Sequence, residues 1–318
     1  MIMGGRAVTL GACGGACGAV LIACALSFAA DPSPGRSAVY VTPAGAALVG
    51  QGLALAAPTG TATDFQEVSA PGVVFQANQA QATPSPWVDS NLWRFQRGLQ
   101  KARYAKLPAG SAPLAAAEAF AFRVDATLNP DPADVAELGK VLAFLKAQDQ
   151  PALPVMANIG VVDDRSQAMG EVLNMLTRRN LLYRVVAAPD RGLDLTVQLG
   201  SADFPKESAQ NPSDFAARVR SKLGDDKRLV RLYGTNTTIA HLTGDGRRAR
   251  LALLSYSRNR MQQGMRARVL GRYQTPKFAA YGTAPGALLT EIDNSGNAIE
   301  FSVPMFSTIA IIDLDAVK

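Results

Sequence analysis

Residues 155–186 read VMANIGVVDDRSQAMGEVLNMLTRRNLLYRVV, and this stretch decides the predicted fold. Val155–Val162 is an apolar run typical of a buried strand, and Leu182–Val186 is a second one. Ser166 is positioned to cap a helix between them. That helix carries an apolar stripe at helical spacing: Met169, Val172, Leu173 and Leu176. The stretch therefore predicts a strand–helix–strand unit.

The same alternation continues toward the C-terminus. Leu193–Leu199 reads as a third strand, Asn211 opens another helix, and Leu229–Tyr233 reads as a further strand. Strands that alternate with helices predict a small doubly wound parallel sheet, which we assign to residues 151–236.

Beyond Thr235 the apolar residues recur at every second position, which is typical of half-buried strands. Gly244–Gly246 supplies a hairpin turn between the first two of them. The expected strands are Thr238–Leu242, Ala249–Tyr256, Met265–Tyr273, Leu288–Ile292, Ile299–Val303 and Thr308–Leu314. We therefore expect an antiparallel β-sandwich over residues 237–318, and an α/β plus all-β fold for the whole chain.

Residues 31–150 have a weaker pattern and are interpreted as a linker followed by a poorly assigned α+β region. Ala38–Val41 and Val73–Gln76 are its best strand candidates. Ala115–Val124 predicts a helix, and Asp131 is positioned to cap a second helix that starts at Pro132.

Residues 1–30 have the features of a bacterial secretion signal. Arg6 precedes an uncharged apolar run, and small residues stand just before Asp31. We expect export to the periplasm or the medium after cleavage. Two alternatives stay open: lipidation of Cys24, which would attach the protein to a membrane, and an uncleaved membrane anchor.

The cysteine and histidine content excludes several chemistries. The chain has three cysteines, Cys13, Cys17 and Cys24, and all lie inside the predicted signal. Its single histidine, His241, excludes sites built from several histidines. No phosphate-binding or dinucleotide-binding motif is present, so we expect neither a metal nor a cofactor.

The chain carries a formal net charge of +6, and arginines are frequent near its C-terminal end. No helix-turn-helix, zinc-finger or RNA-recognition signature accompanies them, so we interpret them as a solvated face and expect no nucleic-acid partner. A glycan partner and assembly into a homo-oligomer stay open. The arginines concerned are Arg247, Arg248, Arg250, Arg258, Arg260, Arg266, Arg268 and Arg272.

The order of these segments resembles the C-terminal half of multidomain bacterial glycoside hydrolases. In several such families a catalytic barrel precedes a domain like class I glutamine amidotransferases, and a β-sandwich follows. The resemblance covers about residues 155–318. It rests on Ala157–Asp164, Glu171–Leu176, Asn180–Tyr183, Ala249–Tyr256, Phe301–Pro304 and Ile311–Leu314.

Two departures limit what this resemblance implies about activity. An active amidotransferase-like domain needs a nucleophilic cysteine, and the mature chain has none. A catalytic barrel takes about 250 residues, whereas only residues 36–150 are available for it. The resemblance therefore implies a non-catalytic module and brings no active site with it.

Asp89 and Glu118 are the candidate catalytic carboxylates, because glycoside hydrolysis needs two carboxyl groups close together. Trp87 and Trp93 are candidate sugar platforms. In the structural alternative both tryptophans anchor the core, Glu118 pairs with an arginine such as Arg94 or Arg123, and Asp89 caps a turn.

Asp163, Asp164 and Ser166 are candidate ligand-binding residues. They follow a strand at the edge where open α/β sheets bind ligands, and the two acids suit a cation or sugar hydroxyls. The alternative is a plain helix cap at Ser166 beside solvated acids.

Our leading hypothesis is an exported, carbohydrate-related accessory protein that binds glycans or assembles with partners. The first alternative is a glycoside hydrolase that uses Asp89 and Glu118. The second is a periplasmic scaffold with no ligand.

Overall fold

A computed structural model describes residues 37–58, 64–76, 85–257 and 264–317. The predicted signal, residues 1–30, lies outside these ranges, as do its three cysteines and the choice between cleavage and lipidation. Within the described ranges, no helix is both long enough and apolar enough to cross a bilayer.

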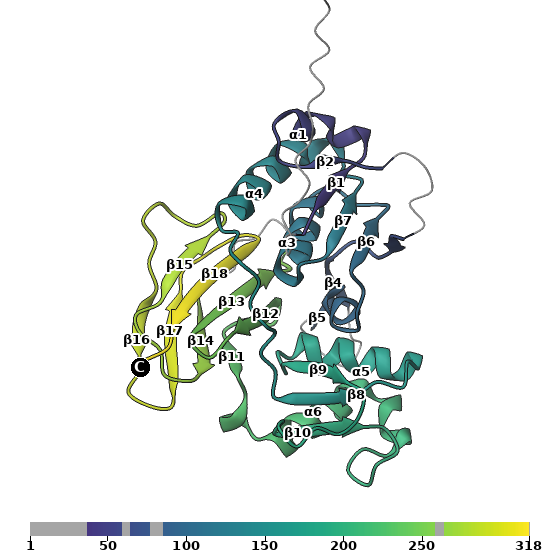
Figure 1. Cartoon of the computed structure of the whole chain (residues 1–318), viewed down its shortest axis with the longest axis vertical. Coiled ribbons are helices and arrows are strands. Elements are labelled where there is room, and N and C mark those ends of the chain that lie inside the picture. Colours follow the sequence, from purple (N-terminus) through teal and green to yellow (C-terminus); the bar gives the residue numbers. More distant parts are fainter. Residues whose placement is uncertain (1–36, 59–63, 77–84, 258–263, 318) are drawn as a thin grey trace, which may run out of the picture. The chain divides into compact units, whose positions relative to one another are not determined.

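The N-terminal region contains a five-stranded sheet in which neighbouring strands are parallel (Figure 1). The expected strand at Ala38–Val41 is confirmed as β1, but the sequence did not predict the sheet around it. Two of its strands are only two residues long, which gives no readable alternation. In sheet order the strands are β2 (Leu55–Ala56), β1 (Val39–Val41), β7 (Asp125–Leu128), β6 (Lys101–Tyr104) and β3 (Gln66–Glu67).

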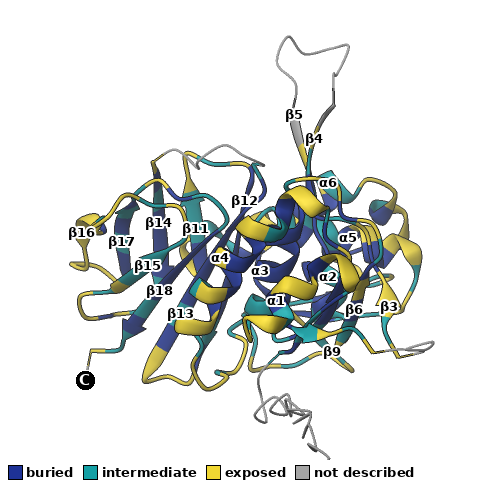
Figure 2. Cartoon of the chain, turned by 90° about the horizontal axis from the view of Figure 1, so that it is seen from above, coloured by how far each residue is buried: buried dark blue, intermediate teal, exposed yellow. Residues whose placement is uncertain are grey.

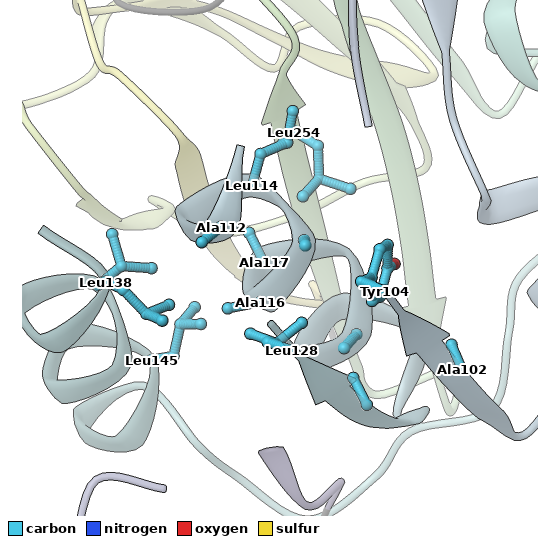
Figure 3. Close-up of a cluster of buried hydrophobic side chains, with 14 of the residues drawn as sticks. Ala102, Tyr104, Ala112, Leu114, Ala116, Ala117, Leu128, Leu138, Leu145 and Leu254 are labelled. Carbon is cyan, nitrogen blue, oxygen red and sulfur yellow. The ribbon is translucent and has the colours of Figure 1, made fainter. Parts of the chain in front are cut away.

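Helix α3 (Ala112–Phe122) lies at the centre of the first hydrophobic core, where Ala112 to Ala119 are all buried. A helix that is apolar on every side needs partners all round it. Figure 3 shows these partners: Leu138 and Leu145 of α4 (Val135–Ala147), Leu128 of β7, and Leu254 from the C-terminal region. The core therefore joins the parallel sheet to the C-terminal strands.

The predicted helices in this region are confirmed with shifted ends. Helix α3 begins at Ala112, before the expected Ala115, and ends at Phe122, because the next residue, Arg123, has a left-handed φ of 56°. Asp131 accepts a 2.9 Å hydrogen bond from the amide of Ala133, as expected of a cap. A 3₁₀ turn (Pro132–Asp134) then leads into α4. Two short helices complete the region: α1 (Ala46–Gly50), preceded by a 3₁₀ turn (Pro43–Gly45), and α2 (Leu92–Gln96).

The central segment forms the predicted strand–helix–strand unit, within a parallel sheet of order β10-β8-β9. Ser166 caps its first helix by accepting a 3.1 Å hydrogen bond from the amide of Met169, as expected. The strand expected at Val155–Val162 begins only at Ile159, and Val155 instead forms an isolated bridge with Thr243. The elements are β8 (Ile159–Val162), α5 (Gln167–Arg178), β9 (Tyr183–Val186), β10 (Leu195–Gln198) and α6 (Pro212–Leu223).

Two expectations for this sheet are wrong. The strand expected at Leu229–Tyr233, β11 (Val230–Tyr233), does not extend it and pairs antiparallel with β14 (Met265–Leu270). The doubly wound arrangement is not formed by α5 and α6 either. The two helices pack on each other and share one core with Ile159 and Val161, which point to the same face of the sheet. Two 3₁₀ turns, Lys206–Gln210 and Asp225–Lys227, flank α6.

The C-terminal region forms two four-stranded sheets with antiparallel pairing, β11-β14-β17-β16 and β12-β13-β18-β15. Side chains of both sheets fill a common core, among them Val269 and Phe301 from the first and Leu251 and Ile312 from the second. The expected hairpin is confirmed. The remaining bounds are β12 (Thr238–Gly244), β13 (Arg248–Ser255), β15 (Lys277–Ala280), β16 (Thr290–Asp293), β17 (Ala298–Val303) and β18 (Ile309–Asp315).

A separate two-stranded hairpin joins β4 (Gly72–Gln76) to β5 (Ser85–Asp89), so the strand expected at Val73–Gln76 is confirmed. Figure 2 shows helix α3 in dark blue, in keeping with its burial. Val88 points into the first core, whereas Trp87 on the other side of the strand is 36% exposed.

Candidate functional site

The predicted carboxylate Glu118 lies on α3 with no exposed surface. Its Oε1 accepts hydrogen bonds from the amide of Asn91 at 3.1 Å and from the hydroxyl of Tyr256 at 2.7 Å. Its Oε2 accepts from Nδ2 of Asn91 at 3.2 Å and from the hydroxyl of Tyr104 at 2.8 Å. Burial raises the pKa of Glu118, and these hydrogen bonds oppose that rise without cancelling it. These four hydrogen bonds indicate a structural role for the carboxylate of Glu118, which connects α3 to Asn91, Tyr104 and Tyr256.

The second predicted carboxylate, Asp89, lies at the end of β5 and is half-buried. Its Oδ1 is 3.4 Å from the hydroxyl of Ser69, whose carbonyl accepts a 2.8 Å hydrogen bond from Asn91. Asp89 and Glu118 are thus linked through Ser69 and Asn91. They do not face each other across either of the two pockets described below, because neither residue lines one.

Each of the two predicted tryptophans has an arginine over its ring. The guanidinium carbon of Arg178 lies 3.9 Å from the ring centroid of Trp87, and that of Arg94 lies 4.3 Å from Trp93. Trp93 also packs against the core of α5. The structure therefore separates them: Trp93 borders a pocket, whereas Trp87 lies on the hairpin.

The predicted residues Asp163, Asp164 and Ser166 lie at the carboxyl end of β8. Arg97 on the turn after α2 holds Asp163 in a bidentate pair, with both distances 2.7 Å. Burial opposes ionisation of Asp163, but its bonds from Arg97 and from the Arg165 amide outweigh that cost and hold its pKa below the usual range. Asp164 accepts a 2.9 Å bond from the Ser166 amide. These residues connect α2 to the start of α5.

A pocket of about 290 Å³ lies where α3 ends against strands β12, β13 and β18. We call it the aromatic pocket. Thr243 of β12 and Ala252 of β13 line it, and so does Leu153, which lies in the segment between α4 and β8. Its defining residues are Phe120, Phe122, Gln96, Gln100, Gln150 and His241.

The charged groups of the aromatic pocket are already paired. Arg123 donates to Asp149 at 2.8 Å and to the carbonyl of Gln150. Arg250 forms a bidentate pair with Asp313 at 2.6 and 2.8 Å. Burial lowers the pKa of His241 to about 4, so its imidazole is neutral at neutral pH.

A second, more open pocket of about 560 Å³ lies beside Trp93. We call it the basic pocket. Gln100, on the segment between α2 and β6, lines both pockets. Its charged residues are Arg94, Arg97, Lys101, Arg165 and Asp64.

Sequence reasoning missed most of these pocket residues. The aromatic pocket combines α3, a connector and three strands, so its members are far apart in the chain. One local signal was present: Phe120 and Phe122 lie in the last turn of α3, directly before Arg123. Among the described residues, no group of three or more histidine, cysteine or acidic side chains is arranged to hold a metal ion.

No protein-family model matches the sequence, and no curated protein matches it at a significant level. Among solved structures, α-L-fucosidase isoenzyme 2 from Paenibacillus thiaminolyticus is similar, with a TM-score of 0.50 at 11% identity. The match covers 66% of this chain and 57% of the fucosidase. The fold resembles part of a glycoside hydrolase. The resemblance expected from the sequence is thus confirmed at the level of the fold.

Two β-galactosidases match over a larger share of this chain but with lower scores. The one from Rahnella sp. R3 has a TM-score of 0.33 at 10% identity, and the one from G. stearothermophilus has 0.37 at 6%. Each match covers 78% of this chain, and 54% and 53% of the respective enzymes. The chain therefore spans little more than half the length of these three glycosidases.

Proposed function

We propose that the protein is an exported, non-catalytic carbohydrate-binding accessory protein whose aromatic pocket holds an uncharged sugar residue. The observation that carries the proposal is the lining of this pocket. It combines aromatic rings with amide side chains, and its arginines are neutralised by their own partners.

Sugar rings present C–H groups on their faces and hydroxyls at their edges. The ring of Phe120 suits the faces, since buried apolar contact is the main source of affinity in a pocket, whereas the ring of Phe122 already stacks on His241 with their centroids 3.9 Å apart. Gln96, Gln100 and Gln150 add amide groups that can bond hydroxyls, although Nε2 of Gln150 is 3.4 Å from Asp313 and Oε1 of Gln96 is 3.5 Å from the hydroxyl of Thr177. Pockets of ~300 Å³ and above hold small ligands, which suits one or two sugar units.

The charge balance of the pocket favours a neutral ligand. Arg123 and Arg250 each bond a carboxylate and a backbone carbonyl, and His241 is uncharged at neutral pH. A ligand carboxylate would have to compete with Asp149 and Asp313 for these guanidinium groups. An uncharged sugar meets no such competition.

Two observations support binding rather than hydrolysis. None of the described residues that line the aromatic pocket is an aspartate or a glutamate, and hydrolysis needs two carboxyl groups. Glu118 has no exposed surface, and both its oxygens are occupied by donors. We further propose that the amidotransferase-like segment and the C-terminal β-sandwich serve as assembly surfaces, as their place in the predicted resemblance suggests.

Binding is tested by isothermal titration with soluble tetramers from cellulose, xylan, mannan and dextran. We expect at least one to bind, and Phe120→Ala to weaken that binding by about tenfold, the equivalent of 1.4 kcal/mol. Tyr233→Ala removes an exposed aromatic ring on β11, outside the pocket, and should leave affinity unchanged. If no tetramer binds, or if both variants weaken binding equally, the proposal is wrong.

The hydrolase alternative makes a different prediction for the same chain. Release of reducing ends from any of these tetramers, abolished by Glu118→Gln without a change in melting temperature, would replace our proposal with catalysis. Export is tested separately by mass spectrometry of the mature N-terminus. An intact Met1 in exported material would rule out both cleavage and lipidation.

A further inference from the structure

The basic pocket gathers more positive than negative charge. Arg94, Arg97, Lys101 and Arg165 line it, whereas Asp64 is its one acidic lining residue among those described. Asp163 beneath Arg97 adds a second negative charge.

These cations differ in how closely they are paired with acidic side chains. Arg97 is committed to Asp163, and Arg165 reaches the same carboxylate at 3.4 Å while 66% of its side chain stays exposed. Lys101 is 3.5 Å from Asp64 with 42% of its side chain exposed. Arg165 also donates a 3.0 Å hydrogen bond to the carbonyl of Arg97, and both Lys101 and Arg165 line the pocket with part of their side chains exposed.

Arg94 provides a third donor at the pocket wall. Its guanidinium stacks on Trp93 and donates a 3.1 Å hydrogen bond to Oδ1 of Asn91, a neutral acceptor. Because Asn91 is uncharged, this hydrogen bond does not neutralise the positive charge of Arg94. Even when Asp164 is counted with Asp64 and Asp163, the positive charges around the pocket outnumber the negative ones.

We infer that the basic pocket binds the carboxylate of an acidic sugar, so that the ligand of this protein is a uronic-acid-containing glycan. Guanidinium and ammonium groups form their strongest hydrogen bonds with oxyanions, and a planar guanidinium matches a carboxylate. Gln100 borders both pockets, so we expect one oligosaccharide to reach both of them. The inference rests on the proposed glycan binding and names its ligand class.

The test compares tetrasaccharides of hyaluronan and unsulfated chondroitin, in which uronic acids alternate with uncharged units, with their carboxyl-reduced counterparts, which keep the ring and linkage but lose the charge. At low ionic strength and neutral pH, we expect at least one acidic tetramer to bind about tenfold more tightly than its reduced form. Added salt should shrink that ratio, because both Lys101 and Arg165 are exposed to screening.

The double variant Lys101→Gln/Arg165→Gln should bring the ratio close to one and leave binding of the reduced tetramer unchanged. Arg218→Gln/Arg247→Gln removes the same charge from exposed positions on α6 and the β12–β13 turn, and should preserve the ratio. Thermal melting of both variants identifies any loss of folding. If the Lys101→Gln/Arg165→Gln variant does not fold, the single variant Lys101→Gln replaces it, and we expect a smaller fall in the affinity ratio.

Equal affinity for acidic and reduced tetramers would overturn the inference, and so would an equal loss in the control variant. Failure of the proposed function gives a different pattern. In that case the reduced tetramers do not bind, and Phe120→Ala leaves the acidic tetramers unaffected. If no tetramer of either kind binds, both proposals are wrong.

Discussion

The hydroxyl of Tyr256 donates a 2.7 Å hydrogen bond to the buried carboxylate of Glu118. Tyr256 follows β13 in the C-terminal sheets, and Glu118 lies on α3 beside the parallel sheet. The two residues are 138 positions apart in the chain. This contact therefore fixes one half of the protein against the other at a buried point.

Tyr256→Phe should lower the free energy of unfolding by about 1.5–3 kcal/mol, because a buried hydrogen bond to a charged group is lost. Urea denaturation measures the change. Tyr281→Phe is the matched control, since Tyr281 donates to Glu137 at 2.6 Å on the exposed surface. If both variants lose the same free energy of unfolding, burial does not strengthen the hydrogen bond from Tyr256 to Glu118.

The stability of the wild type relative to Glu118→Gln should fall as pH rises. Burial raises the folded-state pKa of Glu118 above its unfolded value. Its contribution is therefore fully present below the unfolded pKa and is lost as pH rises through the folded one. Unfolding of both proteins measured between about pH 4 and pH 8 gives the difference. A difference that is constant across this range would show that the pKa of Glu118 is not raised.

His241 should titrate near pH 4, because burial disfavours its charged form. As the chain has a single histidine, its C2 proton resonance reports this pKa directly by NMR. The pKa of His241 is lower in the folded state than in the unfolded state. Burying the neutral imidazole therefore adds to the free energy of unfolding above the unfolded pKa of about 6.5, and this contribution is lost as pH falls toward 4. The loss is on the order of 3 kcal/mol. A titration near 6.5 in the folded protein would refute this.

Asp163→Asn should lower the free energy of unfolding by about 1.5–3 kcal/mol, since Arg97 then lacks its buried partner. The pKa of Asp163 is lowered, so the stabilisation holds at neutral pH and is lost as pH falls through the folded pKa. Glu67→Gln breaks the exposed pair with Arg103 and should cost less than ~1 kcal/mol. Similar losses in both variants would mean that burial of Asp163 adds nothing.

Local patterns predicted the four longer helices and two of their caps, but not the short helices α1 and α2. Ser166 and Asp131 cap helices as their positions indicate, because a cap depends only on the next three residues. Sheet membership was less predictable. Leu229–Tyr233 is a strand as expected, yet its partner is β14, and strand pairing depends on distant residues.

The site was harder to predict than the fold, for the same reason. The sequence offers Glu118 as a catalytic acid or as the partner of an arginine such as Arg94 or Arg123, because nothing near it reveals Tyr256 or Tyr104 as its donors. Trp93 was a reasonable ligand candidate and does border a pocket, but the arginine on its ring is a neighbour in the chain, Arg94. No sequence motif marks the glutamines whose amide groups line the aromatic pocket.

The first hydrophobic core has a consequence for how the chain can be divided. It contains Leu114 and Leu142 from the N-terminal region together with Ile239, Leu254 and Ile311 from the C-terminal strands. A chain cut at residue 236 would leave the N-terminal layer with an open apolar face, which is costly in water. We therefore expect these two regions to melt in one cooperative transition, and neither to be expressed as a folded fragment without the other.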